Sequence, residues 1–185
     1  MYDLNSIDSK NKYVFAHLFV EKRTKQKCRE LFKQIKDTNY DQIKKQYEKE
    51  KHKTINKRKF ITFVSDGFHN YETSAKHYFY PLAKFIAGVP IACNKYGLKH
   101  NNNAIERHNC KLKERLKIMR PGFRNQEYTE SFMNLQRILH NFINPHQGLK
   151  GKTPAETAGI DLKLGRQKLL NLIKLKAKDN HHSQR

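Results

Sequence analysis

Two runs of apolar residues near the amino terminus are typical of β-strands. Residues 2–8 and 13–20 are rich in β-branched and aromatic side chains, and residues 9–12 between them make a polar turn of hairpin length. The second run is apolar at nearly every position, which is typical of a strand inside a sheet covered on both faces. The pattern predicts an antiparallel hairpin at the start of a layered structure.

A helical period follows the hairpin. Between residues 24 and 37 the apolar positions recur at intervals of three and four, at Cys28, Leu31, Phe32 and Ile35. Residues 41–59 then carry few apolar anchors and a dense run of charge. We interpret residues 40–59 as a solvated helix or an insertion rather than a dedicated DNA-contacting element.

The middle of the chain alternates strand and helix patterns. Residues 60–65 are β-branched and aromatic and predict a buried strand. A short polar helix is expected over residues 69–78, and a further strand over residues 85–93, where Pro90 indicates a sheet edge or a strand end. Strands that alternate with helices indicate an α/β fold.

Two amphipathic helices are predicted in the next segment. The first contains Glu106, ends at residues 120–122, and is expected to turn one stripe toward the core, made of Ile105, Leu112, Leu116 and Met119. The inner side of the second is expected to carry Tyr128, Phe132, Leu135, Leu139 and Phe142.

The last part of the sequence predicts a short capped helix and a basic one. Thr153 and Glu156 have the spacing of a capping box, and Pro154 stands at the first helical position between them. Residues 162–178 form a basic amphipathic pattern, and residues 179–185 are expected to fray.

Composition narrows the class of protein. The 185 residues, 37% of them hydrophobic, are enough for one domain with a core. The net charge of +21 favours a nucleic-acid partner, although a ribosomal-type or membrane-surface protein would show the same total. No apolar stretch approaches the roughly 20 residues of a membrane span. Cys28, Cys93 and Cys110 lack CxxC spacing, so we expect a cytoplasmic protein without disulfides.

Two carboxylates stand out against the basic background. Asp66 closes the strand pattern of residues 60–65, at the end where ligands sit in open α/β sheets, and Glu106 follows 40 positions later. Two such acids could share a hard divalent cation, an arrangement suited to phosphoryl transfer. The alternative roles are structural: a strand-end aspartate that caps a turn, and a glutamate favoured by a helix dipole.

A basic ridge extends along and beyond the helix that contains Glu106. Such side chains position DNA through its phosphates without reading its sequence. The expected DNA contacts are Lys111, Lys113, Arg115, Lys117, Arg120 and Arg124.

Residues 2–160 resemble the DDE-type transposases of prokaryotic insertion sequences and, more distantly, retroviral-type integrases. The motifs that carry the resemblance, in chain order, are Asp8 with Arg23; Asp66 and Gly67 with Tyr71; Asn102 to Asn109 with Lys113, Arg115 and residues 120–123; and Asn144 to His146 with residues 149–156. The resemblance implies a ribonuclease H-like α/β fold with additional carboxyl-terminal helices. It also implies DNA, both element ends and target, as the partner, two Mg²⁺ (or Mn²⁺) ions as cofactors, no small-molecule cofactor, and a homo-oligomer. Asp66 and Glu106 would be the second and third metal-binding catalytic acids.

One departure from the family pattern affects the expected activity. The family's first acid lies on a strand before the hairpin, and this sequence begins too late to contain that strand. We therefore expect residues 1–161 to be a partial catalytic core, truncated at its first strand, and residues 162–185 to be a basic helix and tail. DNA binding should survive, while metal-dependent strand cleavage and transfer should be absent or poor, although Asp8 could stand in for the missing acid.

Two other functions remain open on the sequence. One is a non-catalytic, basic nucleic-acid-binding protein whose acids are structural. The other is a nuclease of the same fold that hydrolyses RNA in a hybrid, which would cleave without joining strands.

Overall fold

The computed structural model describes residues 2–88, 103–118 and 125–182. It begins with the predicted hairpin, in which β1 (Tyr2–Ile7) pairs antiparallel with β2 (Val14–Val20). The register places Tyr2 opposite Val20 and Ser6 opposite Ala16, and it shifts between Ser6 and Ile7. The hairpin prediction is confirmed.

The helix after the hairpin is longer than its apolar pattern indicated. Helix α1 (Lys25–Lys51) begins at the N-cap Thr24, whose hydroxyl accepts a hydrogen bond from the Lys27 N–H at 3.3 Å. Its first half buries the predicted apolar stripe. The helix continues beyond the apolar stripe of residues 24–37 to Lys51, and Ile43 is buried in the core. Residues 41–51, within the segment interpreted as a solvated helix or insertion, are thus helical and form the second half of α1.

A buried glutamate fixes the end of α1. Glu50 is only 3% exposed, and its carboxylate accepts hydrogen bonds from Lys53 Nζ at 2.6 Å and from the Lys59 N–H at 2.9 Å. These two bonds hold the pKa of Glu50 below its usual value. The turn that contains η1 (Ile55–Lys57) is thereby tied to the helix, and the chain returns toward the sheet.

A second, parallel pair of strands follows. Strand β3 (Thr62–Ser65) is connected to β4 (Lys84–Ala87) through α2 (His69–Phe79), with Thr62 opposite Lys84. The predicted strand and polar helix are confirmed. The later part of the strand expected over residues 85–93, including Pro90, lies outside the described residues.

The remaining elements are helical. They are α4 (Asn103–Ile118), α5 (Gln126–Ile138), the π-helix η2 (Leu139–Ile143), η3 (Gln147–Leu149), α6 (Pro154–Thr157) and α7 (Lys168–His182). The capping box at α6 is confirmed in both directions. The predicted start of the last helix at residue 162 is wrong, since α7 begins at Lys168, and it continues to His182 instead of fraying from residue 179.

The inner face of α5 also differs from the expected one. Tyr128 and Leu135, both predicted to face the core, are 67% and 46% exposed. The buried residues are instead Thr129, Met133 and Gln136, one position further along. The side-chain oxygen of the buried Gln136 accepts a hydrogen bond from the Arg115 guanidinium on α4, so this polar residue has a partner beside the apolar Met133.

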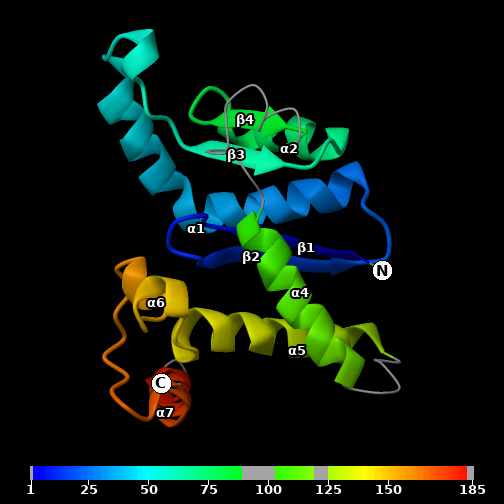
Figure 1. The fold of residues 1–185 in the computed structure, drawn as a ribbon, viewed down its shortest axis with the longest axis vertical. Coiled ribbons are helices and arrows are strands. Elements are labelled where there is room, and N and C mark those ends of the chain that lie inside the picture. The colour runs from blue at the N-terminus through cyan, green and yellow to red at the C-terminus, as the bar shows by residue number, and fades with distance from the viewer. Residues whose placement is uncertain (1, 89–102, 119–124, 183–185) are drawn as a thin grey trace.

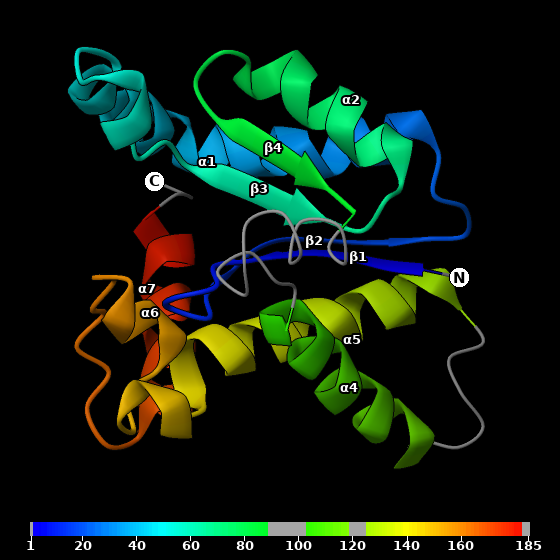
Figure 2. The same ribbon diagram turned by 45° about the horizontal axis from the view of Figure 1, so that its top comes forward.

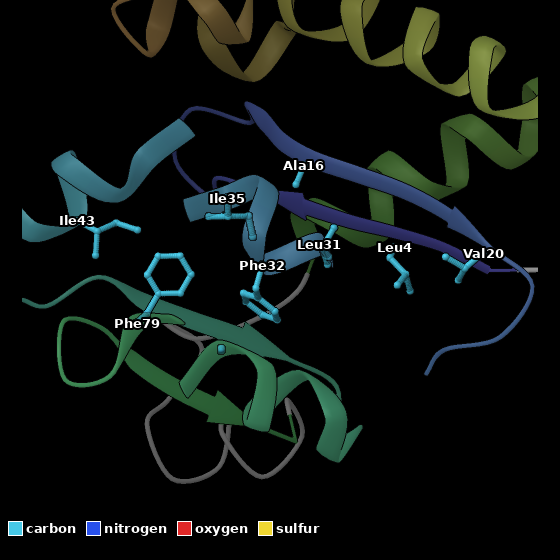
Figure 3. Packing of buried hydrophobic residues seen from close by; sticks show 9 residues of the cluster. Leu4, Ala16, Val20, Leu31, Phe32, Ile35, Ile43 and Phe79 are labelled. Atoms are coloured by element: carbon cyan, nitrogen blue, oxygen red, sulfur yellow. The ribbon is translucent and has the colours of Figure 1, made fainter. Parts of the chain in front are cut away.

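The elements form layers around α1. Figures 1 and 2 show α1 on one face of the β1–β2 sheet and α4 and α5 on the other, while α2 packs against α1 and β4. The core joins β1, β2, α1 and α2, with Leu31, Phe32 and Ile35 of α1 at its centre (Figure 3). The chain thus has a mixed α/β fold, with two separate two-stranded sheets in the part that the structure describes.

Within residues 2–88, 103–118 and 125–182, each helix is too short or too polar to cross a bilayer.

Candidate functional site

Asp66 follows the last residue of β3, where the sequence placed it. Its side chain is 53% exposed, and Oδ2 accepts a hydrogen bond from Arg23 Nη1 at 3.2 Å. Oδ1 accepts one from the Phe68 N–H, also at 3.2 Å. The carboxylate therefore caps the turn that leads into α2 and pairs with a guanidinium, which is the structural role that the sequence left open.

Arg23 is held between aromatic rings. Its guanidinium carbon lies 4.5 Å from the centroid of Phe68 and 5.1 Å from that of Tyr2, within the range of cation–π attraction. Partial burial lowers the pKa of Arg23, but its hydrogen bond with Tyr71 and the charge of Asp66 outweigh this, so the pKa is raised. The cation beside Asp66 is permanent.

Tyr71 completes this cluster. Burial, together with the nearby charge of Asp66, raises the pKa of the Tyr71 phenol to about 12, against the lowering effect of Arg23. The phenol therefore stays protonated at neutral pH. It can hold Arg23 and Asp66 in place, and it cannot act as a base.

Glu106 lies in the first turn of α4, and its side chain is exposed. The helix is anchored to β1, where Asn5 Nδ2 donates a hydrogen bond to Asn109 Oδ1 at 3.1 Å. Among the contacts between described residues, none joins Glu106 to Asp66. The convergence of these two carboxylates on one cation stays a prediction.

In the three described ranges, no group of three or more His, Cys, Asp or Glu side chains is placed to hold a metal ion. Mg²⁺ and Mn²⁺ prefer several oxygen ligands at close to octahedral geometry. Asp66 already pairs with a cation, so the described residues do not form a complete site for either ion.

Asp8, the candidate replacement for the missing acid, is also engaged in local structure. Its Oδ1 accepts hydrogen bonds from the N–H groups of Lys10 at 2.6 Å and Asn11 at 2.8 Å. This carboxylate shapes the β1–β2 turn, where Lys12 adopts a positive φ of 60°. Turn formation accounts for Asp8 without a metal.

The predicted basic ridge is described in part. Lys111, Lys113 and Arg115 are exposed along α4, and Arg115 also donates to Gln136. The side chain of Lys117 and the whole of Arg120 and Arg124 lie outside the described residues. Three of the six predicted phosphate contacts are therefore available at the surface of α4.

His108, His140 and His146 form a cluster at α4 and the segment after α5, and the sequence did not predict that these three rings come together. The ring centroids of His108 and His140 lie 4.7 Å apart, and those of His140 and His146 lie 6.4 Å apart. Burial and the proximity of His140 lower the pKa of His108 to about 4, and burial lowers the pKa values of the other two rings. The spacing of His108 from Ile105 and Leu112, by three and four residues, could have placed it on the buried stripe.

A cavity of about 880 Å³ lies between β1 and β3. Its lining includes Ile7 of β1, Phe63 of β3, Ile35 of α1 and Ile105 of α4. His108 and Lys111 also reach it, but Asp66 and Glu106 do not line it. This cavity thus lies between secondary-structure elements and does not surround the two acids.

The chain was compared with models of protein families, with curated proteins and with solved structures, and none of these comparisons gives a match.

Proposed function

We propose that this chain contains a DDE-type transposase core with a ribonuclease H-like fold, and that it binds DNA. The family reaction is Mg²⁺-dependent (or Mn²⁺-dependent) strand cleavage and strand transfer in transposition, with Asp66 and Glu106 as two of its metal-binding acids. Both steps are expected to be impaired in this chain, because Asp66 is paired with Arg23 and the described residues form no complete metal site.

One observation carries the proposal: Asp66 stands at the carboxyl end of β3, a strand reached from the β1–β2 hairpin through the crossover helix α1. The carboxyl ends of strands are where α/β folds place ligand-binding groups. Lys111 and Lys113 add exposed positive charge on the helix that contains Glu106, in a chain with a net charge of +21. This charge favours a polyanionic substrate.

The DNA-binding part is tested by a salt titration. Binding to a fluorescent 30-base-pair duplex is measured by anisotropy between 50 and 300 mM KCl, with Lys113→Ala compared against Lys33→Ala, an exposed lysine of α1. If Lys113 neutralises one phosphate, its loss lowers the slope of log affinity against log salt by about 0.9. An unchanged slope for Lys113→Ala removes this residue from the interface.

The catalytic part is tested with a radiolabelled DNA substrate and Mg²⁺ or Mn²⁺. We expect little or no strand cleavage or joining by this chain. Turnover that Asp66→Asn abolishes, and that Asp37→Asn leaves intact, would show a working site and refute the proposed impairment. Asp37 serves as the control because it is an exposed carboxylate of α1.

A second function is favoured by a specific contact. Asp66 accepts hydrogen bonds from Arg23 and from the Phe68 N–H. These bonds favour a structural role for Asp66, as expected in a non-catalytic nucleic-acid-binding protein. In that case DNA affinity is the same with Mg²⁺ or EDTA, and Asp66→Asn leaves it unchanged at both conditions. In the transposase case, Mg²⁺ raises the affinity of the parent chain for DNA, and Asp66→Asn removes that increase.

A further inference from the structure

A second cavity lies beside the first residues of the parallel strands β3 and β4. Its volume is about 670 Å³, within the range of roughly 300–1,000 Å³ that small-molecule sites occupy. Thr62 and Lys84 pair at this end, where the turn after α1 and the loop from α2 to β4 also lie (Figure 2), whereas Asp66 follows the other end of β3. Neither Asp66 nor Glu106 lines this cavity, so it is separate from the two acids.

Four cationic side chains line this second cavity, and no acid is among the described residues that line it. Lys59 comes from the segment after α1, Lys76 from α2 and Lys84 from β4, and all three are exposed. Arg58 is partly buried beside Lys59. In the ion pairs between described residues, only Lys76 of the four takes part, with Glu72 at 2.6 Å. Three cations without a carboxylate partner favour an anionic ligand.

The two cations nearest α1 are held by bonds to that helix and its turn. The Lys59 N–H donates to the Glu50 carboxylate at 2.9 Å, and the Lys59 carbonyl accepts a hydrogen bond from Gln46 Nε2 at 3.1 Å. Arg58 Nε donates to the Lys53 carbonyl at 2.9 Å, which leaves the terminal guanidinium nitrogens for another acceptor. A backbone that is already fixed lowers the ordering cost of binding a ligand.

Aromatic rings line the same space. Phe60 is stacked on Tyr47, with ring centroids 5.3 Å apart, and Lys84 Nζ lies 5.6 Å from the centroid of Phe60. Tyr80, in the loop before β4, lines the cavity with a side chain that is 77% exposed. Rings and cations therefore adjoin one another, so a ligand that joins a flat aromatic group to an anionic group would contact both.

A nucleotide has both properties. Its base stacks on aromatic side chains, and its phosphate oxygens accept hydrogen bonds from lysine and arginine. We propose that this second cavity binds a nucleotide, with the base on the Tyr80 ring and the phosphate at Arg58, Lys59 and Lys84. The ligand chemistry is the same for a free nucleoside monophosphate and for an unpaired nucleotide of a single strand.

This site is additional to the basic ridge of α4 and does not depend on the proposed transposase reaction. Lys113 of that ridge is not among the residues that line the second cavity. A base within a duplex keeps its faces stacked on neighbouring bases, so Tyr80 would not reach it. Lys113→Ala should therefore leave nucleotide binding unchanged, and Tyr80→Ser should leave duplex binding unchanged.

Calorimetric titration of the full chain with adenosine monophosphate, adenosine and inorganic phosphate tests the inference. Adenosine monophosphate should bind about 5- to 150-fold more tightly than inorganic phosphate, since stacking of one base contributes a factor of this size. Tyr80→Ser should remove most of this difference, and Tyr80→Phe should keep it. The matched control is Tyr128→Ser, because Tyr128 is a 67% exposed tyrosine of α5.

The phosphate contact has its own variant. Lys84→Ala should weaken binding of adenosine monophosphate by about fivefold and leave adenosine binding unchanged, with Lys33→Ala of α1 as the control. If Tyr80→Ser fails to fold, 2-aminopurine riboside monophosphate is titrated into the parent chain, where stacking on a ring should quench its fluorescence.

A competing single strand of eight deoxyadenosines identifies the source of the nucleotide. A strand that displaces adenosine monophosphate and binds at least about tenfold more tightly assigns the site to unpaired nucleic acid, in which several bases and phosphates contribute. A strand that binds no more tightly assigns it to the free nucleotide. Both results support the inference.

Three results would overturn it. One is equal affinity for adenosine monophosphate and inorganic phosphate, which would indicate a general attraction of anions to a basic surface. Another is an equal effect of Tyr80→Ser and Tyr128→Ser, or, in the fluorescence titration, no quenching. The third is an effect of Lys84→Ala no larger than that of Lys33→Ala. An unchanged salt slope for Lys113→Ala would leave the inference standing, because that result concerns duplex DNA on α4.

Discussion

The side chain of Asn141 forms hydrogen bonds with both backbone groups of Val14 at the start of β2, as a neighbouring strand would. Its Oδ1 accepts a hydrogen bond from the Val14 N–H at 2.9 Å, and its Nδ2 donates one to the Val14 carbonyl at 3.0 Å. Both residues are buried, at 3% and 1% exposure. Asn141→Leu keeps a similar volume but leaves both backbone groups of Val14 without a partner and away from water.

The size of the effect follows from those two groups. An unsatisfied buried donor or acceptor costs about 1–3 kcal/mol, so the loss of both partners should lower the free energy of unfolding by about 2–6 kcal/mol. For a chain of this length, at about 2–4 °C per kcal/mol, that lowers the melting temperature by roughly 4–24 °C. This is a large part of the roughly 5–15 kcal/mol that stabilises a typical protein.

Urea unfolding followed by circular dichroism at constant pH measures this loss. The matched control is Asn144→Leu, three residues further on, where the side chain is exposed. We expect the control to change the free energy of unfolding by less than about 0.5 kcal/mol. An equally small change for Asn141→Leu would refute the reasoning, because it would mean that the Val14 backbone finds other partners.

Three further predictions concern the site and its surroundings. Arg23→Lys should lower the melting temperature by a few degrees, because lysine lacks the planar guanidinium that bonds Asp66 and lies over the ring of Phe68 at the same time. Thermal unfolding of Arg23→Lys, compared with Lys22→Arg at an exposed neighbouring position, measures this loss. His108 has a pKa of about 4 when folded, against 6.5 for the free side chain, so the unfolded chain takes up the proton first and stability is lost as pH falls from 6.5 toward 4. Urea midpoints across this range should fall less steeply for His108→Gln, and parallel curves would contradict the assignment. Iodoacetamide at pH 8 should modify the exposed Cys110 and spare Cys28, because Cys28 is buried and its pKa is raised. Peptide mass spectrometry measures both reactions, and Cys28 should react once urea unfolds the chain. Equal rates at both thiols in the folded chain would be inconsistent with this.

The sequence predicted the elements whose signals are local. The hairpin, β3, α2 and the capping box each depend on residues within one short segment, so alternation and cap chemistry were sufficient to find them. Beyond residue 37 the sequence left a solvated helix or an insertion open, because the second half of α1 is held by Ile43 and Glu50 rather than by a continuous apolar stripe. Periodicity detects apolar spacing and cannot detect a single buried acid that bonds to the next turn.

The error at α5 has a similar cause. Its buried face contains Gln136, whose partner Arg115 is on another helix, and no pattern within α5 reveals that bond. The π-helix η2 then adds a residue to the turn, so the next buried position is Asn141, five residues after Gln136. A regular helical wheel cannot anticipate such an insertion.

The candidate site was predictable only as a set of separate positions. The strand pattern placed Asp66 correctly at the end of β3, because the strand and the turn after it are both marked by residues that adjoin one another in the sequence. Its pairing with Arg23, 43 residues earlier, depends on how α1 returns the chain to β3. The distance between Asp66 and Glu106 depends in the same way on tertiary packing, so the sequence alone leaves it a prediction.

Helix α1 is not straight, and this has a mechanical consequence. It curves in its middle (Figure 1), close to where the Thr38 hydroxyl donates to the carbonyls of Gln34 at 3.0 Å and Ile35 at 3.3 Å, a type of bond that often bends helices. The helix packs against β1 and β2, and its Phe32 contacts Phe63 of β3. A straighter α1, as expected for Thr38→Ala, would therefore shift the two strand pairs relative to one another.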